Sequence, residues 1–252
     1  MCGSLSWMLS CTWEDLLQYP ADIVLPYCRG LRMDRLGVGR DGQVVRVMPS
    51  IKVLERRLLY GVRKLHLGTK VDAIDERRIV EGVAYDAIIV ATEAKAVPKV
   101  VPHCSNVFAK ISYHPSTIYL HTDESFMPPN RDDWKCWNVE MSSGRREPQL
   151  TFWLNQFYPD ATFDGDVFQT WAPVCEPQKE TIIGRSDFER VVHSKDTRSY
   201  VAAIDGEQGK NGIYYAGSYC VYGMGLLEQA LISGNAASNK VLIDLFGDFR
   251  PA

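Results

Sequence analysis

The sequence predicts a mixed α/β fold in which an α/β half is interleaved with a β-rich half. Residues 87–91 are a continuous apolar run, which is typical of a strand covered on both faces of a sheet. Residues 213–216 have the same character, and a glycine-punctuated turn and a helical pattern over about 225–245 follow them. Between these two regions, from about 105 to 190, helical periodicity fades and aromatic residues become frequent, which predicts an antiparallel sheet with long loops.

The other expected elements follow from local patterns. Apolar residues at helical spacing run through 4–19, where Thr12 and Asp15 are expected to cap a short helix that begins at about Trp13. Pro49 and Ser50 open a helix that ends at about Tyr60. The remaining strands are expected at 44–47, 64–67, 70–75 and 78–80.

The order of these elements predicts a discontinuous domain organisation. Residues 41–100 and 201–252 form the α/β half, and residues 101–200 form the β-rich domain. The helices within residues 1–40 are assigned to the β-rich domain.

Composition excludes several classes of protein. The chain has 252 residues, of which 46% are hydrophobic and 23% charged, as in ordinary globular proteins. A formal net charge of −3 gives no global field that would favour nucleic acid. No apolar run approaches the roughly 20 residues that span a bilayer, and the N-terminus lacks the features of a signal peptide. The seven cysteines are odd in number and form no C-x-x-C pair, which favours a reducing, cytoplasmic compartment.

The turn after residue 216 has the composition of a ligand-binding loop. Gly217, Gly223 and Gly225 allow close approach of the backbone. The following helix starts at about Gly225 and points its free N–H groups into the turn, which suits anionic or electron-rich groups. A strand, a glycine-rich loop and a helix N-terminus are how α/β folds present dinucleotides. The spacing alone fits an ordinary strand–turn–helix unit equally well.

This stretch resembles the C-terminal FAD-contact motif of the flavin-containing amine oxidase superfamily. In that family a strand ends in Ala-Gly, and a helix with the pattern Gly-x-x-x-x-Ala-x-x-Ser-Gly-x-x-Ala follows. The matching residues here are Ala216-Gly217, Gly225, Ala230, Ser233-Gly234 and Ala237. The chain is also similar to amine-oxidase-like predicted NAD/FAD-binding proteins at 119–128, at Trp134 and Trp137-Asn138, at 151–155 and at 170–173. The resemblance runs from about residue 40 to the end.

The resemblance implies FAD as cofactor and assigns residues to it. Val71 is expected on a short strand, where its backbone contacts the adenine, and Thr92 lies near the dinucleotide. Gly217 and Ser218 are placed at the ribityl hydroxyls, although the family usually has an acidic residue where Ser218 stands. Four further residues are placed at the flavin pyrimidine edge or the pyrophosphate: Gly223, Gly225, Leu226 and Leu227. A plain strand valine at Val71 and a helix cap at Thr92 are the structural alternatives.

The chain departs from the family at its N-terminus. The superfamily begins with a strand, Gly-x-Gly-x-x-Gly and a helix, which together carry the FAD pyrophosphate. Residues 37–42 match this pattern literally, but a charged stretch precedes them and a strand-like stretch follows. The fingerprint needs a strand before it and a helix after it, so we interpret this match as a turn. The chain is therefore expected to be the C-terminal portion, or fragment, of a larger flavoprotein or a family member without the first unit.

Other reactive residues give weak signals. His121 and Asp123 share one face of an expected strand, with His114 nearby, but a third ligand at a telling spacing is missing. We therefore predict no metal site and favour structural packing for this group. Cys220 is expected to be a small buried hydrophobic residue. Four tryptophans are candidates for core positions or for lining a substrate cavity: Trp134, Trp137, Trp153 and Trp171.

These features predict an FAD-dependent oxidoreductase that transfers hydride from an organic small molecule, of apolar or lipid-like character, to the flavin. Such chemistry needs placement and desolvation and often no protein acid or base, so no catalytic residue is predicted. One alternative is a non-catalytic protein that keeps the fold as a binding subunit. The other is a subunit that completes its dinucleotide site with another chain.

Overall fold

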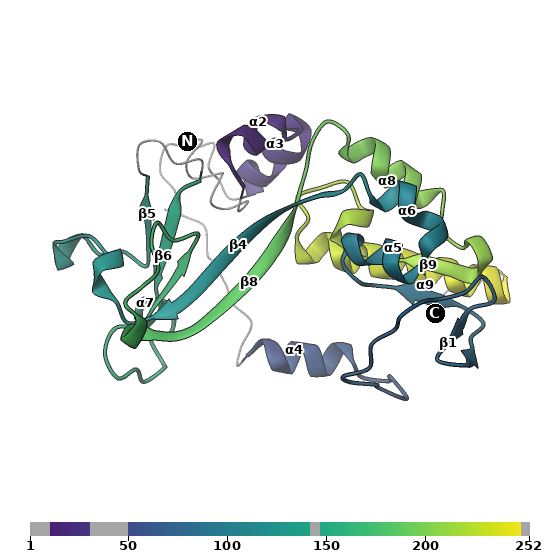
Figure 1. Ribbon diagram of the computed structural model, residues 1–252, viewed down its shortest axis with the longest axis horizontal. Helices are drawn as coiled ribbons and strands as arrows, with labels where there is room; N and C mark the ends of the chain where they lie inside the picture. The colour runs from purple at the N-terminus through teal and green to yellow at the C-terminus, as the bar shows by residue number, and fades with distance from the viewer. Residues whose placement is uncertain (1–10, 31–49, 142–146, 248–252) are drawn as a thin grey trace. The chain divides into compact units, whose positions relative to one another are not determined.

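The computed structural model describes residues 11–30, 50–141 and 147–247 (Figure 1). The chain divides into two compact units. Unit 1 consists of Met1–Pro20 and Ala109–Val201, and unit 2 consists of Ala21–Phe108 and Ala202–Ala252. The two units thus alternate along the sequence, and each unit is assembled from two separated stretches of chain. The four-segment division at residues 40, 100 and 200 stays a prediction.

Unit 1 is built on a five-stranded antiparallel sheet with the strand order β5-β6-β7-β4-β8 (Figure 1). The long strands β4 and β8 pair from Ser112 opposite Val192 to Leu120 opposite Gly184, and the register shifts between Leu120 and His121. The strand bounds are Trp137–Glu140 (β5), Gln149–Trp153 (β6), Phe168–Trp171 (β7), Ser112–His121 (β4) and Ile182–Val192 (β8). The antiparallel sheet predicted between about 105 and 190 is confirmed.

The core of unit 1 lies around Phe168, which is fully buried. Phe168 packs with the buried side chains of Met127 and Trp134, and Trp153 packs against them. The rings of Trp134 and Trp153 meet edge to face with centroids 5.3 Å apart, which is a favourable arrangement for aromatic quadrupoles. These aromatic side chains therefore supply much of the apolar area that the sheet buries.

Short helices complete unit 1. In α2 (Trp13–Gln18) the Thr12 hydroxyl accepts a hydrogen bond from the Asp15 amide, and the Asp15 carboxylate accepts one from the Thr12 amide. This reciprocal cap confirms the predicted helix start. The other helical segments are η3 (Glu124–Phe126), η4 (Arg131–Asp133), α7 (Leu154–Phe157), η5 (Lys179–Thr181) and α8 (Thr197–Asp205), whose last residues belong to unit 2.

Unit 2 is organised around two short parallel strands, β3 (Ile88–Val90) and β9 (Ile213–Tyr215). The long helix α9 (Leu227–Phe246) packs on β9 through a cluster of Tyr214, Ala216 and Ala237 (Figure 1). Its remaining elements are α3 (Ala21–Gly30), α4 (Ile51–Leu58), the hairpin β1 (Ile79–Val80) and β2 (Val83–Ala84), η1 (Ala94–Ala96), α5 (Val97–Val100), η2 (Pro102–Cys104), α6 (Ser105–Phe108), η6 (Lys210–Gly212) and η7 (Ser218–Cys220).

Two of the expected strands do not form. Residues 64–67 and 70–75 have no strand pairing in the structure. Gly68, Lys70 and Asp72 are poor strand formers, and they interrupt the apolar alternation. The segment is fixed at its end, where the Ile74 amide donates to the Val100 carbonyl over 2.8 Å. Val71 therefore lies in an irregular segment and not on the strand that the sequence predicts.

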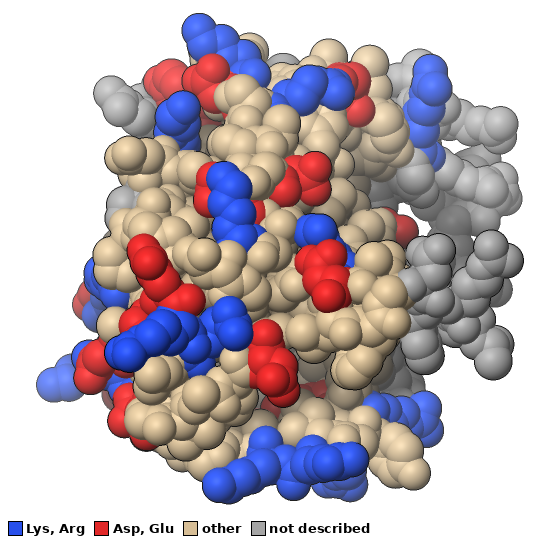
Figure 2. Space-filling view, turned by 90° about the vertical axis from the view of Figure 1, so that its right-hand side faces the viewer, with Lys and Arg blue, Asp and Glu red and all other residues tan. Residues whose placement is uncertain are grey.

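The overall expectation of a mixed α/β fold is confirmed. Helix α9 begins at Leu227, two residues later than expected. Within the described ranges, no helix combines the length and the apolar character needed to cross a bilayer. Figure 2 shows cationic and anionic side chains intermingled on one face of the molecule.

The buried position of Phe168 makes a prediction about stability. We expect Phe168→Ala to lower the free energy of unfolding by about 3–5 kcal/mol, because it removes the ring on which the core of unit 1 packs. The matched control is Phe246→Ala, whose ring is 73% exposed, and which should change stability little. Chemical denaturation followed by tryptophan fluorescence measures both. Equal effects would contradict the assigned core.

Candidate functional site

The carboxyl ends of β3 and β9 meet at one edge of unit 2. The strands pair in parallel from Ile88 opposite Ile213 to Val90 opposite Tyr215, and the Ala216 amide donates to the Val90 carbonyl over 3.0 Å. Thr92 and Gly217 both follow directly, so two predicted site residues lie just beyond neighbouring strand ends. Open α/β sheets bind their ligands at this position.

A cavity of about 500 Å³ lies beside β3. Its volume falls within the range of small-molecule pockets, roughly 300–1,000 Å³. The residues that line it include Thr69, Val71, Ile74, Val90, Ala91 and Thr92. The structure therefore brings Val71 and Thr92, which are far apart in the sequence, to one cavity.

The chemistry of this cavity is apolar. Among the described residues that line it, none is a carboxylate, a histidine, a lysine or a cysteine. The polar side chains of the lining are the hydroxyl groups of Thr69, Tyr85 and Thr92. Such a lining can enclose a flat apolar group and orient it by hydrogen bonds, but it supplies no strong acid or base.

Tyr219 connects the two strand ends. Its hydroxyl donates to the Thr92 carbonyl over 2.9 Å, and its ring is buried. A Cβ atom at Gly217 would lie 2.5 Å from a carbon of this ring, so the glycine is required by internal packing. The Gly217 amide donates to the buried Ser233 hydroxyl on α9 over 2.7 Å. The Gly217 backbone thus holds the loop to the helix.

The turn before α9 is held by contacts with the first turn of the helix. The Leu226 amide donates to the Gln229 side-chain oxygen over 2.9 Å. A Cβ atom at Gly223 would lie 3.0 Å from the Gln229 side chain. Gly225 has a φ of +70°, in the left-handed region that favours glycine. Leu227 is 81% exposed.

The four residues placed at the flavin edge or the pyrophosphate do not line the cavity beside β3; they are Gly223, Gly225, Leu226 and Leu227. Ser218 lies half-buried in η7, next to Gly217. The contacts of Gly217 and Ser218 with the ribityl chain, and of the other four residues with the flavin or the pyrophosphate, stay predictions.

Cys220 is half-buried in the same turn. Burial raises the pKa of its thiol to about 12, so the thiol stays protonated at neutral pH and is a poor nucleophile. The Gly-x-Gly-x-x-Gly match at residues 37–42 and the strand expected at 44–47 lie outside the described residues.

His121 and Asp123 belong to a structural network in unit 1. The Asp123 amide donates to His121 Nδ1 over 3.1 Å, so the ring proton resides on Nε2, which donates to the Thr170 hydroxyl over 2.8 Å. The Thr170 hydroxyl in turn lies 2.9 Å from that of Thr151. His121 is fully buried, and burial lowers its pKa to about 4.

The Asp123 carboxylate organises the following turns. It accepts hydrogen bonds from the Gln178 amide over 2.9 Å and from the Ser125 amide over 3.0 Å. Burial opposes ionisation, but these hydrogen bonds hold the pKa of Asp123 below its usual value. The His121 ring and the Asp123 carboxylate, which the sequence offered as possible metal ligands, therefore both have hydrogen-bond partners within the protein.

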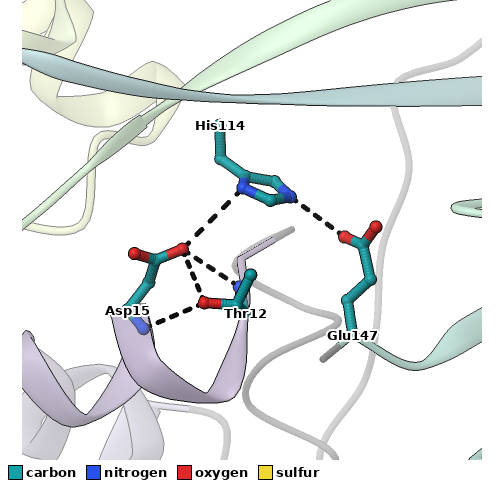
Figure 3. Close-up of polar contacts among 4 residues, drawn as sticks. All are labelled: Thr12, Asp15, His114 and Glu147. Atoms are coloured by element: carbon teal, nitrogen blue, oxygen red, sulfur yellow. Dashed lines mark hydrogen bonds and ion pairs between the residues drawn. The ribbon is translucent and has the colours of Figure 1, made fainter. Parts of the chain in front are cut away.

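His114 lies apart from this network, between two acidic side chains (Figure 3). Its Nε2 is 3.0 Å from a Glu147 carboxylate oxygen, and its Nδ1 is 3.7 Å from Asp15. The two carboxylates face opposite edges of the ring, so they cannot share a metal ion with one imidazole nitrogen. Across the described ranges, no group of three or more histidine, cysteine or acidic residues is arranged to hold a metal.

The tryptophans contribute to unit 1 in different ways. Trp134 and Trp153 belong to the aromatic core, and the Trp153 indole donates to Asp166 over 2.8 Å. Trp171 packs edge to face on Phe188. Trp137 is 43% exposed. None of these four residues lines the cavity beside β3.

The sequence did not single out Tyr219 or Thr69. Tyr219 is one aromatic residue in a tyrosine-rich stretch, and no spacing rule marks it as the residue that connects the strand ends. Thr69 comes from an irregular segment without a periodic pattern. The positions of Tyr219 and Thr69 at the site are therefore visible only in the structure.

Comparison with known proteins gives a likeness of fold. No family model matches the chain, and no curated protein matches it. A crystal structure of a reduced UDP-galactopyranose mutase matches with a TM-score of 0.50 and 12% identity, over 69% of this chain and 46% of that chain. The chain thus matches less than half of the mutase. A CLA-producing fatty acid isomerase from P. acnes matches with a TM-score of 0.43 and 10% identity, over 69% of this chain and 46% of that chain.

At this sequence identity the mutase shows a shared fold and nothing about activity. The fold of the matched part of the chain is thus one that a known enzyme also uses.

Two glycines should respond in opposite ways to the same substitution. We expect Gly217→Ala to destabilise the chain by about 1–3 kcal/mol, because the new Cβ atom must displace the buried Tyr219 ring. We expect Gly234→Ala, at a position of α9 with no neighbouring atom within 4 Å, to stabilise it by up to about 1 kcal/mol through helix propensity. Thermal unfolding of both variants measures the pair. Destabilisation by both would argue against the packing at Gly217.

The neutral His121 should make stability depend on pH. Because its pKa falls from about 6.5 in the unfolded chain to about 4 in the folded one, the unfolded chain binds a proton first. The contribution of neutral His121 to the free energy of unfolding is complete above pH 6.5 and is lost as the pH falls toward 4, with a loss of up to about 3 kcal/mol. Denaturation curves between pH 7 and 4 measure it. His121→Gln should flatten the curve relative to the exposed control His66→Gln.

Proposed function

We propose that the chain binds FAD and serves a flavin-dependent enzyme. The observation that carries this proposal is the cavity at the end of the parallel pair, where Val71 and Thr92 come together. The resemblance to the amine oxidase superfamily implies that Val71 contacts the adenine of FAD and that Thr92 lies near the dinucleotide. The likeness of fold to a mutase that was crystallised in a reduced form supports the proposal.

The residues present fit the adenine end of the cofactor. The cavity is apolar, is lined by Val71 and bears the Thr92 hydroxyl, so it suits a flat heterocycle with polar edges. Val71 and Thr92 would hold this end of the cofactor. When bound, the flavin would supply the redox chemistry, and this chain would contribute placement and the exclusion of water.

The proposed substrate is an organic small molecule of apolar or lipid-like character, and the reaction is hydride transfer to or from the flavin. The protein of the first matched structure is a mutase, so a reaction without net oxidation belongs to the same proposal. The unit that carries the pyrophosphate is proposed to come from another chain or from a part of a longer protein. The proposed compartment is the cytoplasm.

A second candidate function is a non-catalytic binding subunit that keeps the fold without the flavin. It is favoured by the amides of Gly217 and Leu226, which are already hydrogen-bonded to Ser233 and Gln229. Backbone donors that are satisfied internally have no need of a ligand. The two candidates differ in one property, the retention of FAD.

Visible absorption of the purified chain, after addition of FAD and desalting, tests the first candidate. We expect retained flavin bands, and we expect Val71→Glu to reduce retention at least about tenfold, because it places a carboxylate in an apolar cavity. The matched control is Val83→Glu. Val83 is 52% exposed on β2 and does not line the cavity.

Retention by wild type and Val83→Glu, with loss in Val71→Glu, supports the proposal. Equal retention in all three proteins overturns the assignment of the cavity. A colourless wild type rejects FAD binding by this chain and supports the second candidate. Circular dichroism of each variant separates loss of the site from loss of folding.

A further inference from the structure

The stretch from the start of α4 to residue 67, called the α4 segment below, exposes apolar side chains to solvent. Helix α4 buries none of its residues (Figure 1). Between residues 51 and 67 every residue except Val53 and Leu54 is exposed. The exposed large apolar residues are Ile51, Leu58, Leu59, Tyr60, Val62, Leu65 and Leu67. An apolar concentration of this kind on a protein surface marks an interaction site.

Helix α4 has two chemically different sides. Ile51, Leu54 and Leu58 recur at intervals of three and four residues, which places them on one side of the helix. Lys52 and Arg56 are four residues apart and share another side. A surface helix normally turns its apolar side toward the core of its own domain. Here the side chains of Ile51 and Leu58 are 60% and 67% exposed, so the described part of the chain leaves the apolar side uncovered.

The α4 segment also concentrates positive charge. It carries five lysines and arginines and a single acidic residue, Glu55, in a chain whose formal net charge is −3. The five cations are Lys52, Arg56, Arg57, Arg63 and Lys64. No residue that the structure describes forms an ion pair with any of them. This local charge is therefore available to an anionic partner, although the whole chain is acidic.

The combination of charge and apolar surface fits anionic lipid better than protein or nucleic acid. Helices that lie in a membrane interface carry lysine and arginine on the polar side and leucine or aromatic residues on the other. Long cationic side chains can reach lipid phosphates while their stems cover apolar surface. Tyr60 is 92% exposed, and tyrosine is a residue of the headgroup region. Protein interfaces are depleted in lysine, and nucleic acid would leave the apolar side chains in water.

We propose that the α4 segment is a binding site for an anionic phospholipid surface. Helix α4 lies in the plane of the interface, with Ile51, Leu54 and Leu58 against the outer part of the acyl chains and the cations at the lipid phosphates. The attachment is peripheral and depends on charge and apolar area together. This inference goes beyond the proposed function and does not use the cavity beside β3. A chain held at such a surface meets apolar molecules where they are concentrated.

Binding of the full chain to vesicles tests this inference. The probes are vesicles of phosphatidylcholine with about one-third phosphatidylserine, and vesicles of phosphatidylcholine alone. We expect binding to the anionic vesicles to be at least about tenfold tighter in a flotation assay. Raising the salt from about 0.05 M to about 0.5 M should weaken it, because exposed charges are screened. Equal binding to both vesicles, or no binding by the folded chain, overturns the inference.

A leucine substitution locates the apolar contact. Leu58→Gln should weaken binding to the anionic vesicles about fivefold to tenfold, because it removes apolar area from the contact. The matched control is Leu17→Gln in α2, whose side chain is 78% exposed, and which should bind like wild type. Thermal unfolding checks that both variants fold. Equal binding by the two variants would contradict the assigned surface.

A charge substitution locates the polar contact. The double variant Arg56→Gln with Arg57→Gln should weaken binding at least about tenfold at low salt. The control is Lys110→Gln with Lys195→Gln, two exposed positions outside the α4 segment, which changes the net charge by the same amount. Equal losses in the two double variants would show a dependence on total charge alone and would overturn the inference.

Hydrogen exchange gives a readout without any substitution. Amides of residues 51–67 should exchange more slowly when anionic vesicles are added, whereas those of β4 should not change. Unchanged exchange over residues 51–67 would overturn the inference. Self-association that Leu58→Gln abolishes in sedimentation without lipid would overturn it as well, because a second copy of this chain would then cover α4.

Flavin retention, measured on the same samples, separates this inference from the proposed function. Binding to anionic vesicles without flavin retention supports the lipid site and rejects the proposed function. Flavin retention without vesicle binding rejects the lipid site alone.

Discussion

The parallel pairing of β3 with β9 is the contact on which the rest of unit 2 depends. It aligns the two carboxyl ends, so that Thr92 and Gly217 emerge at the same level. It also gives α9 a surface to pack on, through Tyr214 and Ala237. Tyr219 then fixes the distance between the two strand exits by its hydrogen bond to the Thr92 carbonyl. Without the pairing, the cavity beside β3 would have no rigid wall.

The polar chemistry of the chain is divided between two tasks. In unit 1 the buried groups of Asp123, His121 and Thr170 hydrogen-bond to one another. These contacts specify the packing of the sheet. In unit 2 the cavity beside β3 is apolar and its polar groups are hydroxyls and strand backbone. A site of this composition is suited to bind and orient a group that brings its own reactivity.

Sequence patterns found the elements that bury side chains regularly and missed those that do not. The apolar run 87–91 and the helical pattern after Gly225 gave β3 and α9 within two residues, because burial on a fixed period leaves a readable pattern. The strands expected at 64–67 and 70–75 do not form, because Gly68, Lys70 and Asp72 interrupt the apolar alternation there. Val71 still reached the cavity, since its position depends on the anchor of Ile74 on Val100 and not on strand geometry. Tyr219 acts through a contact that no sequence spacing encodes.

The position of residues 109–201 between the two stretches of unit 2 affects the order in which the chain can fold. The hydrogen bond between Tyr219 and Thr92 spans 127 residues, and the β3–β9 pair closes nearly the same loop. The entropy cost of closing a flexible loop rises with its length, by about 0.6 kcal/mol for each doubling. Prior folding of residues 109–201 into their antiparallel sheet would shorten the flexible part of that loop. During synthesis β3 leaves the ribosome long before β9 exists, so for that interval the edge of β3 that pairs with β9 is exposed, and exposed strand edges are prone to aggregation.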